Sequence, residues 1–233
     1  MTIDGKIHCL FEQSGTFKQA FQQLGFKAID YDIRDDFGQT DVVVDIFKAI
    51  KESFAGRRSF LDRITQDDLV LAFFPCIYFN ESNEMYFCGT SYNLRAYEGA
   101  AKLRQIITRA NQRHEYYTLL LKLCCIAESR GWRLIIENPY NAHHYLRFNF
   151  PYKPAVIDMN RRLSGDYYRK PTQFIFVGCE PTTGDSIQLD KPEGFVRDES
   201  TVKRSIISSD YARNFILDKI LGIRHEHSVP TLF

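Results

Sequence analysis

Short apolar runs alternate with helix-like stretches along the chain, and this alternation constrains the fold more than any other feature of the sequence. Strands that alternate with helices predict a mostly parallel sheet with helices on both faces. We therefore expect an α/β, Rossmann-like fold, in which ligands bind at the carboxyl ends of the strands. The strand-like runs cover residues 6–11, 26–31, 42–44, 69–73, 134–136 and 174–177.

Helical periodicity is clearest directly after the first run, where apolar residues recur every three or four positions from Phe17 to Leu24. Gly25 follows as a candidate C-cap, because glycine readily adopts the left-handed conformation that ends helices. The sequence contains no internal repeat, so we expect a single domain over residues 1–233 with a helical insertion around residues 80–130. The helix-like stretches cover residues 16–24, 93–130 and 208–221.

Composition excludes several classes of protein. Hydrophobic residues make up 44% of the chain and charged residues 25%, which is ordinary for a soluble globular protein. The longest apolar runs are too short to span a bilayer, and the first residues form no apolar stretch of signal-peptide length. We expect no membrane partner and a cytoplasmic location. The six cysteines form no C-x-x-C pair, which argues against a metal site and favours reduced thiols.

Candidate cofactor-binding residues follow the first three strand-like runs. Gly15 lies in the first turn, where a glycine lets the backbone approach a ligand closely. Asp30 and Tyr31 end the second run, and an acid there is placed to bind ribose hydroxyls. Asp45 follows the third run and could accept a hydrogen bond from an adenine amino group. An isolated aspartate is more often a solvated residue or an N-cap, but three such features in order favour a cofactor site. The candidate cofactor turn comprises Phe11, Gln13, Ser14, Gly15, Thr16 and Phe17.

The ends of the fourth and fifth runs carry the most reactive side chains. Phe74, Pro75 and Cys76 follow the fourth run, and a thiolate held at a strand exit is a strong nucleophile when its pKa is lowered. Glu137 and Asn138 follow the fifth run, where a buried carboxyl is costly unless it is paired or functional. We expect the thiol and the carboxyl to face the same crevice. The alternatives are a buried structural cysteine and a helix-capping or ion-paired glutamate.

Basic residues are unevenly distributed, although the formal net charge is only +1. Residues 95–133 contain eight basic and three acidic side chains. This excess permits a nucleic-acid footprint, which phosphate contacts would make dependent on salt. The alternative is a set of solvated basic helix faces. The candidate nucleic-acid contacts are Arg104, Arg109 and Arg113, which with Lys102 should lie largely on one helix face, together with Arg169 and Lys170.

Taken in order, these motifs resemble those of the DNA cytosine-C5 methyltransferase family. The turn after the first run looks like the family's cofactor turn, and Asp30 and Asp45 fall where its ribose- and adenine-contacting acids lie. The proline-cysteine pair that ends at Cys76 matches the nucleophile motif of the family. The glutamate-asparagine pair that begins at Glu137 matches a second family motif. The resemblance extends over roughly residues 10–180.

The resemblance implies a class I S-adenosylmethionine-dependent methyltransferase sheet, with S-adenosyl-L-methionine as cofactor and DNA as partner; RNA and the oligomeric state stay open. In the family, a thiolate adds to C6 of cytosine and makes C5 enamine-like, while a glutamate contacts N3 and the exocyclic amine. C5 then attacks the sulfonium methyl, and a base removes the C5 proton. By this carry-over Cys76 is the nucleophile and Glu137 the activating acid, with Asn138 beside it in the catalytic set. A cytosine in duplex DNA would have to flip out to reach them.

The sequence departs from the family pattern at several positions. Pro171 and Gln173 stand where the two arginines of the family's glutamine-x-arginine-x-arginine motif would fall, and Arg169 and Lys170 are the available substitutes. Ile77 follows the nucleophile, where the family usually has glutamine. A short stretch takes the place of the family's large target-recognition region, so sequence readout would have to come from elsewhere.

Two other functions therefore stay open. The first is a catalytically degenerate methyltransferase fold that binds cofactor or nucleic acid, or serves as a subunit. The second is an amino-methyltransferase, because Asn138, Pro139 and Tyr140 resemble the asparagine-proline-proline-tyrosine motif of that class without its second proline. A zinc deaminase, which also acts on cytosine, is excluded because no second cysteine follows Cys76 at the required spacing.

Overall fold

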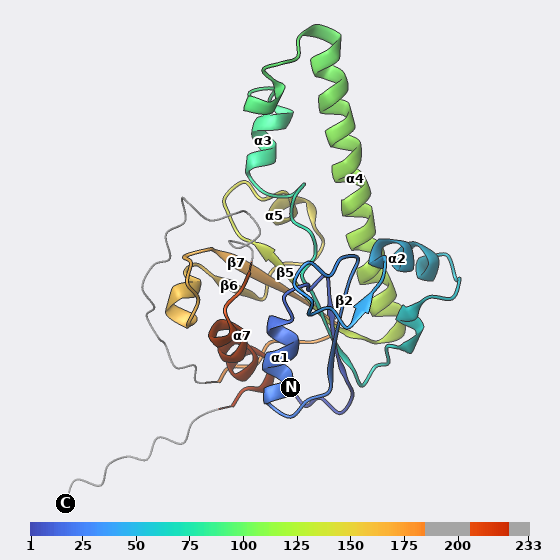
Figure 1. Ribbon diagram of the computed structural model, residues 1–233, viewed down its shortest axis with the longest axis vertical. Helices are drawn as coiled ribbons and strands as arrows, with labels where there is room; N and C mark the ends of the chain where they lie inside the picture. Colours follow the sequence, from blue (N-terminus) through green and yellow to red (C-terminus); the bar gives the residue numbers. More distant parts are fainter. Residues whose placement is uncertain (185–205, 224–233) are drawn as a thin grey trace, which may run out of the picture.

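A seven-stranded sheet forms the centre of the computed structural model, which describes residues 1–184 and 206–223 (Figure 1). The strand order is β3-β2-β1-β4-β5-β7-β6. All strands run parallel except β7, which is antiparallel to both of its neighbours, β5 and β6. The mostly parallel sheet that the sequence predicts is thereby confirmed. The strands are β1 (Ile7–Leu10), β2 (Ala28–Asp32), β3 (Val42–Val43), β4 (Leu69–Ala72), β5 (Arg133–Pro139), β6 (Val156–Asp158) and β7 (Thr172–Val177).

The strand order reverses between β1 and β4. The strands β2 and β3 are added on one side of β1, and β4 and the later strands lie on its other side. Doubly wound sheets bind ligands at such a switch point, outside the carboxyl ends of the strands. The sequence did not predict β6, since its three residues lie at the edge of the sheet and are at least partly exposed. A short, half-exposed strand lacks the apolar run that marks a buried one.

Helices cover both faces of the sheet (Figure 1). The helices α1 and α7 pack together on one face, and α2 and α4 pack together on the other. The expected helix over residues 16–24 is α1, and Gly25 follows it with a φ of 88°, as a C-terminal glycine should. The α-helices are α1 (Thr16–Gln23), α2 (Ile46–Phe54), α3 (Ser82–Phe87), α4 (Gly99–Arg130), α5 (Tyr145–Asn149) and α7 (Ser209–Phe215), with short helical turns at η1 (Phe60–Arg63), η2 (Tyr92–Leu94), η3 (Arg161–Ser164) and η4 (Ile216–Leu221).

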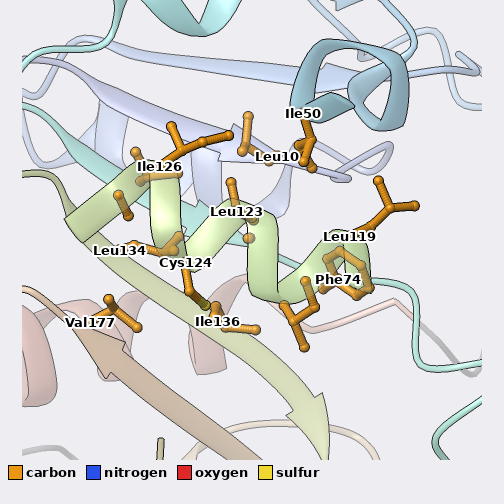
Figure 2. Close-up of a cluster of buried hydrophobic side chains, with 14 of the residues drawn as sticks. Leu10, Ile50, Phe74, Leu119, Leu123, Cys124, Ile126, Leu134, Ile136 and Val177 are labelled. Carbon is orange, nitrogen blue, oxygen red and sulfur yellow. The ribbon is translucent and has the colours of Figure 1, made fainter. Parts of the chain in front are cut away.

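Two apolar cores lie on the two faces of the sheet. The larger core is formed by the α2 and α4 face and contains Leu10, Ile50 and Leu123 (Figure 2). The second core is formed by the α1 and α7 face and contains Phe21 and Ile216. Burial of side chains of this size stabilises a fold by roughly 1.5–3 kcal/mol each. The sheet is therefore anchored on both faces, and its strand ends are held in fixed positions.

The helix α4 is one continuous helix of 32 residues, about 48 Å long at the usual rise per residue. Its fully buried residues all lie between Leu119 and Ala127, so only the carboxyl-terminal half packs on the sheet. The other half projects from the domain beside α3, and we call α3, η2 and this projecting half the arm (Figure 1). The helical insertion expected around residues 80–130 is thus an insertion only in its first part. Within the described ranges, no helix combines the length and apolar character needed to cross a membrane.

Candidate active site

A cavity of about 260 Å³ opens at the carboxyl edge of the sheet, where β1, β4 and β5 end. Glu12 and the rest of the turn after β1 form one wall, and the loop after β4 forms the facing wall. Glu137 of β5 and Lys170, which lies just before β7, also line the cavity, and residues after β2 and before α7 contribute the rest. The thiol and the carboxyl that the sequence places at adjacent strand ends therefore face one cavity. The predicted site residues among its lining are Phe11, Gln13, Ser14, Thr16, Phe17, Phe74, Pro75, Cys76, Glu137 and Lys170.

A second cavity of about 270 Å³ adjoins the first and extends toward β2 and β3. The two cavities share Phe11, Gln13, Arg34 and Pro75 in their linings, so these residues mark the boundary between them. Asp32 and Asp45 line the second cavity with the rings of Phe47 and Tyr116 and the side chain of Ile33. Carboxylates beside apolar and aromatic side chains suit a ligand with both hydroxyl groups and a flat ring. The two cavities together cross the switch point of the sheet.

Cys76 lies in the first cavity and is partly exposed. Burial raises the pKa of its thiol, and the neighbouring Glu137 carboxylate raises this pKa further, while Lys170 lowers it. Backbone hydrogen bonds from Phe79 and Asn80 to the Cys76 carbonyl, at 2.9 and 3.2 Å, form a tight turn that fixes the residue in place. The thiol form is therefore favoured over the thiolate, and more strongly while Glu137 carries its charge.

The side-chain carboxylate of Glu137 accepts no hydrogen bond from any described residue, although it lies near the end of a buried strand. Burial raises the pKa of its carboxyl, and the nearby cations Lys170 and Arg161 only partly oppose this rise. A carboxyl group with a raised pKa keeps its proton more readily and can then donate a hydrogen bond. Arg161 was not among the predicted site residues. It is fully buried and forms an ion pair with Asp166.

Asn138 is fully buried and points away from the cavity lining. Its amide Nδ2 donates to the carbonyl oxygen of Phe74 at 2.9 Å and to that of Glu137 at 2.6 Å. The side chain therefore joins the end of β5 to the loop that carries Pro75 and Cys76. Asn138 does not line either cavity and its Nδ2 is committed to two carbonyls, so its expected place in the catalytic set stays a prediction that this geometry does not support. Its role is to position the loop.

The turn after β1 combines two unusual backbone conformations. Phe11 has a φ of 62°, and it is the one residue other than glycine with a positive φ among residues 1–184 and 206–223. Such a conformation costs roughly 1–3 kcal/mol and is typical of functional sites. The Phe11 ring packs against Phe47 and Phe74, with centroid distances of 5.3 Å to each. Gly15 has a φ of 64°, and a Cβ there would lie 3.2 Å from the Cε atom of Lys18. This position therefore requires glycine.

Glu12 is a residue of this turn that the sequence argument missed. Its side chain is 5% exposed, and its two carboxylate oxygens accept hydrogen bonds from the backbone N–H groups of Phe17, at 2.7 Å, and Lys18, at 3.2 Å. Burial raises the pKa of Glu12 to about 7, although these two N–H donors lower it. The sequence did contain a signal for Glu12, namely an acidic residue in the turn that also contains Gly15.

Asp30 and Tyr31 lie away from both cavities. The Asp30 carboxylate is fully buried, pairs with the Lys18 ammonium at 3.0 Å and accepts from the backbone N–H of Asp41 at 2.6 Å. The hydroxyl of Tyr31 bonds to Nδ1 of His8 at 3.0 Å. Both side chains are used inside the fold, so the expected contact of Asp30 and Tyr31 with the cofactor stays a prediction that this geometry does not support.

Asp32, the last residue of β2, reaches the second cavity in place of Asp30. It is the better candidate for a ribose-binding acid. Asp45 also lines this cavity, but it is exposed and caps α2, accepting from the backbone N–H of Lys48 at 2.9 Å. The expected position of Asp45 near the adenine stays a prediction.

The basic residues of α4 divide into two groups. Arg109 donates to Asn83 at 2.9 Å, and its guanidinium lies 4.4 Å from the centroid of the Tyr78 ring. Arg113 contacts Glu84 of α3 at 3.3 Å and stacks 3.7 Å from the Phe87 ring. Arg104 lies about 200° around the helix from Lys102, so the predicted single basic face contains Lys102, Arg109 and Arg113 without Arg104. Arg109 and Arg113 hold α3 against α4. Arg104 and Arg169 are exposed.

No protein-family model matches this sequence, and a search of curated proteins finds no similar protein. The residues and geometry of the two cavities are therefore the guide to what the protein does. In the part of the chain that the structure describes, no three side chains of histidine, cysteine, aspartate or glutamate converge in a way that could hold a metal ion.

Proposed function

We propose that this protein is an S-adenosyl-L-methionine-dependent methyltransferase that acts on C5 of cytosine in DNA. The observation that carries the proposal is that Cys76 and Glu137, from two adjacent strand ends, line one cavity. A second cavity with a carboxylate at the end of β2 adjoins it. A binding module would need neither a thiol nor a carboxyl that the described residues leave without a hydrogen bond, whereas addition of a thiolate to a pyrimidine ring needs both.

The fold supports the same proposal. The sheet has the doubly wound order with one antiparallel strand, β7, inserted next to β5, which is the arrangement of the class I methyltransferase sheet that the sequence resembles. The residues also fit the cofactor. Asp32 offers a carboxylate for ribose hydroxyls, Phe47 offers an apolar surface for an adenine ring, and Gly15 removes the Cβ that would crowd the turn.

The chemistry follows from the two reactive side chains. S-adenosyl-L-methionine supplies the methyl group. The Cys76 sulfur forms a bond to C6 of the cytosine, and the electron pair of the C5–C6 double bond becomes available at C5. The protonated carboxyl of Glu137 donates a hydrogen bond to N3 and so stabilises the negative charge that develops on the ring. After methylation, loss of the C5 proton and departure of the Cys76 sulfur restore the double bond.

The pKa shifts of the two groups are coupled in a way that suits this sequence of steps. The charge of Glu137 raises the pKa of Cys76, so protonation of Glu137 removes that repulsion and makes the thiolate easier to form. The same proton is the one that Glu137 donates to the ring. Lys170 lowers the pKa of both groups and stabilises the thiolate directly. Lys170 thus takes part of the role that the missing arginines have in the related family.

DNA as the partner rests on the chemistry of the site, since a cytosine must leave the duplex to reach a cavity at the sheet edge. Arg104 and Arg169 are exposed and available for phosphate contacts. The amino-methyltransferase alternative is disfavoured, because the Asn138 amide is buried and bonded to Phe74. A catalytically degenerate protein stays as the second candidate, because Gln173, at one of the two lost arginine positions, is buried and donates to the Pro139 carbonyl.

Incubation with tritiated S-adenosyl-L-methionine and mixed DNA or RNA, followed by nucleoside analysis, tests the proposal. We expect label in 5-methylcytosine from DNA, and none when Cys76→Ser replaces the wild type. Label in N4-methylcytosine or N6-methyladenine would contradict the proposed chemistry. Binding of the cofactor without any transfer to either nucleic acid would favour the degenerate protein.

A further inference from the structure

The helix α1 begins at the turn where doubly wound folds usually hold a ligand's phosphate. In that arrangement the backbone N–H groups of the first helical turn donate to the anion, and the helix dipole favours negative charge. Here the side chain of Glu12 occupies these donors, since its carboxylate accepts from the N–H groups of both Phe17 and Lys18. The protein therefore places its own anion where a pyrophosphate would otherwise bind.

Glu12 is part of the cavity wall as well as the helix terminus. Glu12 as a whole is buried, so water screens the charge of its carboxylate only weakly. Among the described residues no cation forms an ion pair with it, and the ammonium of Lys18, whose backbone N–H it accepts, pairs with Asp30 and Asp41. A buried anion with two N–H donors and no paired cation is a favourable neighbour for a positively charged ligand.

We propose that Glu12 makes this pocket select a cationic sulfonium ligand over its neutral thioether product and over dinucleotides. The inference rests on the proposed function and names the property of the cofactor that the turn after β1 recognises. S-adenosyl-L-methionine and S-adenosyl-L-homocysteine share every group except the methyl and the positive charge of the sulfur. Their affinity ratio therefore isolates the interaction with a nearby anion. A dinucleotide would bring its pyrophosphate against the Glu12 carboxylate and would find the α1 donors already used.

The selectivity should depend on pH, because burial raises the pKa of Glu12 to about 7. The carboxyl is mostly neutral below that pH and mostly charged above it, so preference for the sulfonium should rise with pH. Two other groups with raised pKa values, Cys76 and Glu137, line the same cavity. A control must therefore separate their titration from that of Glu12. The charged or titratable groups around Glu12 are Cys9 of β1, Asp30 of β2 and Lys18 of α1, with Arg34, Asp36, Cys76, Glu137 and Lys170 elsewhere on the cavity lining.

Titration calorimetry of the full chain with the two ligands, at about pH 6 and about pH 8.5 and in buffers of different ionisation enthalpy, measures both effects. If sulfonium binding lowers the pKa of Glu12 by one unit, the ratio of sulfonium to thioether affinity rises by up to about tenfold between these pH values. We expect a rise of this size. Sulfonium binding near pH 7 should release a proton, and thioether binding should not. Glu12→Gln should leave the ratio low and constant, whereas Glu137→Gln should keep the rise.

The possible failures are distinguishable. If neither ligand binds, the proposed function and this inference both fall. If both bind with a ratio independent of pH in the wild type, or if Glu12→Gln keeps the rise, only the inference is overturned. Tighter binding of NAD⁺ than of S-adenosyl-L-methionine would also overturn it. The proton release is measured on the wild type, so the test does not depend on whether the variant folds.

Discussion

The carboxylate of Asp68, at the amino edge of the sheet, is bonded on both oxygens, whereas that of Glu137, at the carboxyl edge, accepts no hydrogen bond from a described residue. Asp68 accepts from the backbone N–H groups of Lys6, at 2.6 Å, and Thr65, at 2.7 Å, and from the Thr65 hydroxyl at 3.0 Å. Burial alone would raise the pKa of Asp68, but these donors outweigh it and the pKa is lowered. For Glu137, burial prevails and the pKa is raised.

The difference shows that acids at the two edges of the sheet have different roles. At the amino edge a buried acid is given donors, so its charge stabilises the fold. At the carboxyl edge, Glu12, Cys76 and Glu137 all have raised pKa values, and Phe11 has a strained backbone. Groups with perturbed pKa values and strained residues cluster at functional sites. We therefore expect substitutions at the carboxyl edge to change chemistry and those at the amino edge to change stability.

The largest expected effect is that of Cys76→Ser on methyl transfer. A serine hydroxyl keeps the shape of the side chain but is a far weaker nucleophile at neutral pH, so the rate should fall by about 10³-fold or more. Cofactor affinity and the free energy of unfolding should stay nearly unchanged, because Cys76 is partly exposed and makes no side-chain hydrogen bond among the described residues. Cys124→Ser in the core is the matched control and should affect stability instead. If Cys76→Ser kept the full rate of methyl transfer, the carboxyl edge would not carry the chemistry proposed for it.

The next largest effect concerns Glu12 and the pH dependence of stability. Its pKa is raised from 4.5 to about 7 in the folded state, so the folded protein binds this proton more tightly than the unfolded chain. The resulting stabilisation is present below about pH 4.5 and is lost as pH rises through about 7, a change of about 3 kcal/mol. Urea unfolding across this range should show wild type losing that amount relative to Glu12→Gln. Parallel curves for the two proteins would mean that Glu12 is not titrating as the geometry implies.

A matched pair of carboxylate-to-amide changes sharpens the comparison directly. Asp68→Asn replaces an acceptor with an amide N–H₂ group that faces N–H donors, and it should lower the free energy of unfolding by about 2 kcal/mol without altering cofactor affinity. Glu137→Gln removes no protein hydrogen bond, so its effect on stability should stay within about 1 kcal/mol. Its effect on transfer should be a loss of about 10²-fold. If Glu137→Gln destabilised the protein as much as Asp68→Asn, Glu137 would be a structural acid.

The smallest expected effect separates two arginines of the arm. Arg113 stacks on Phe87 and contacts Glu84, so Arg113→Ala should cost about 1 kcal/mol and increase amide hydrogen exchange in α3. Arg104→Ala removes an exposed side chain and should change stability by less than about 0.5 kcal/mol. Arg104→Ala should instead weaken DNA binding and reduce its salt dependence. If both variants weakened DNA binding equally and neither changed stability, Arg113 would be a phosphate contact instead of a link between α3 and α4.

Much of this fold could be predicted from the sequence, because six of the strands contain short, mostly apolar runs and α1 has clear helical spacing. The shared crevice of Cys76 and Glu137 could be predicted for the same reason, because the loop after β4 and the end of β5 meet at one edge of a parallel sheet. What the sequence could not provide was the partner of each acid. Asp30 and Asp32 are alike in sequence, and only the approach of Lys18 from α1 decides which of them is buried in an ion pair. Likewise, nothing in the sequence shows that Asn138 turns back to the Phe74 carbonyl.

The most direct test of the central claim is covalent trapping on DNA that contains 5-fluorocytosine. Fluorine at C5 cannot leave as the proton does, so the enzyme should stay bonded through sulfur to C6 once the methyl group has been transferred. We predict a stable complex that requires S-adenosyl-L-methionine, with the modified peptide mapping to Cys76 by mass spectrometry and no complex with Cys76→Ser. The account is contradicted if the wild type methylates normal DNA but forms no adduct, or if the adduct maps to any other cysteine.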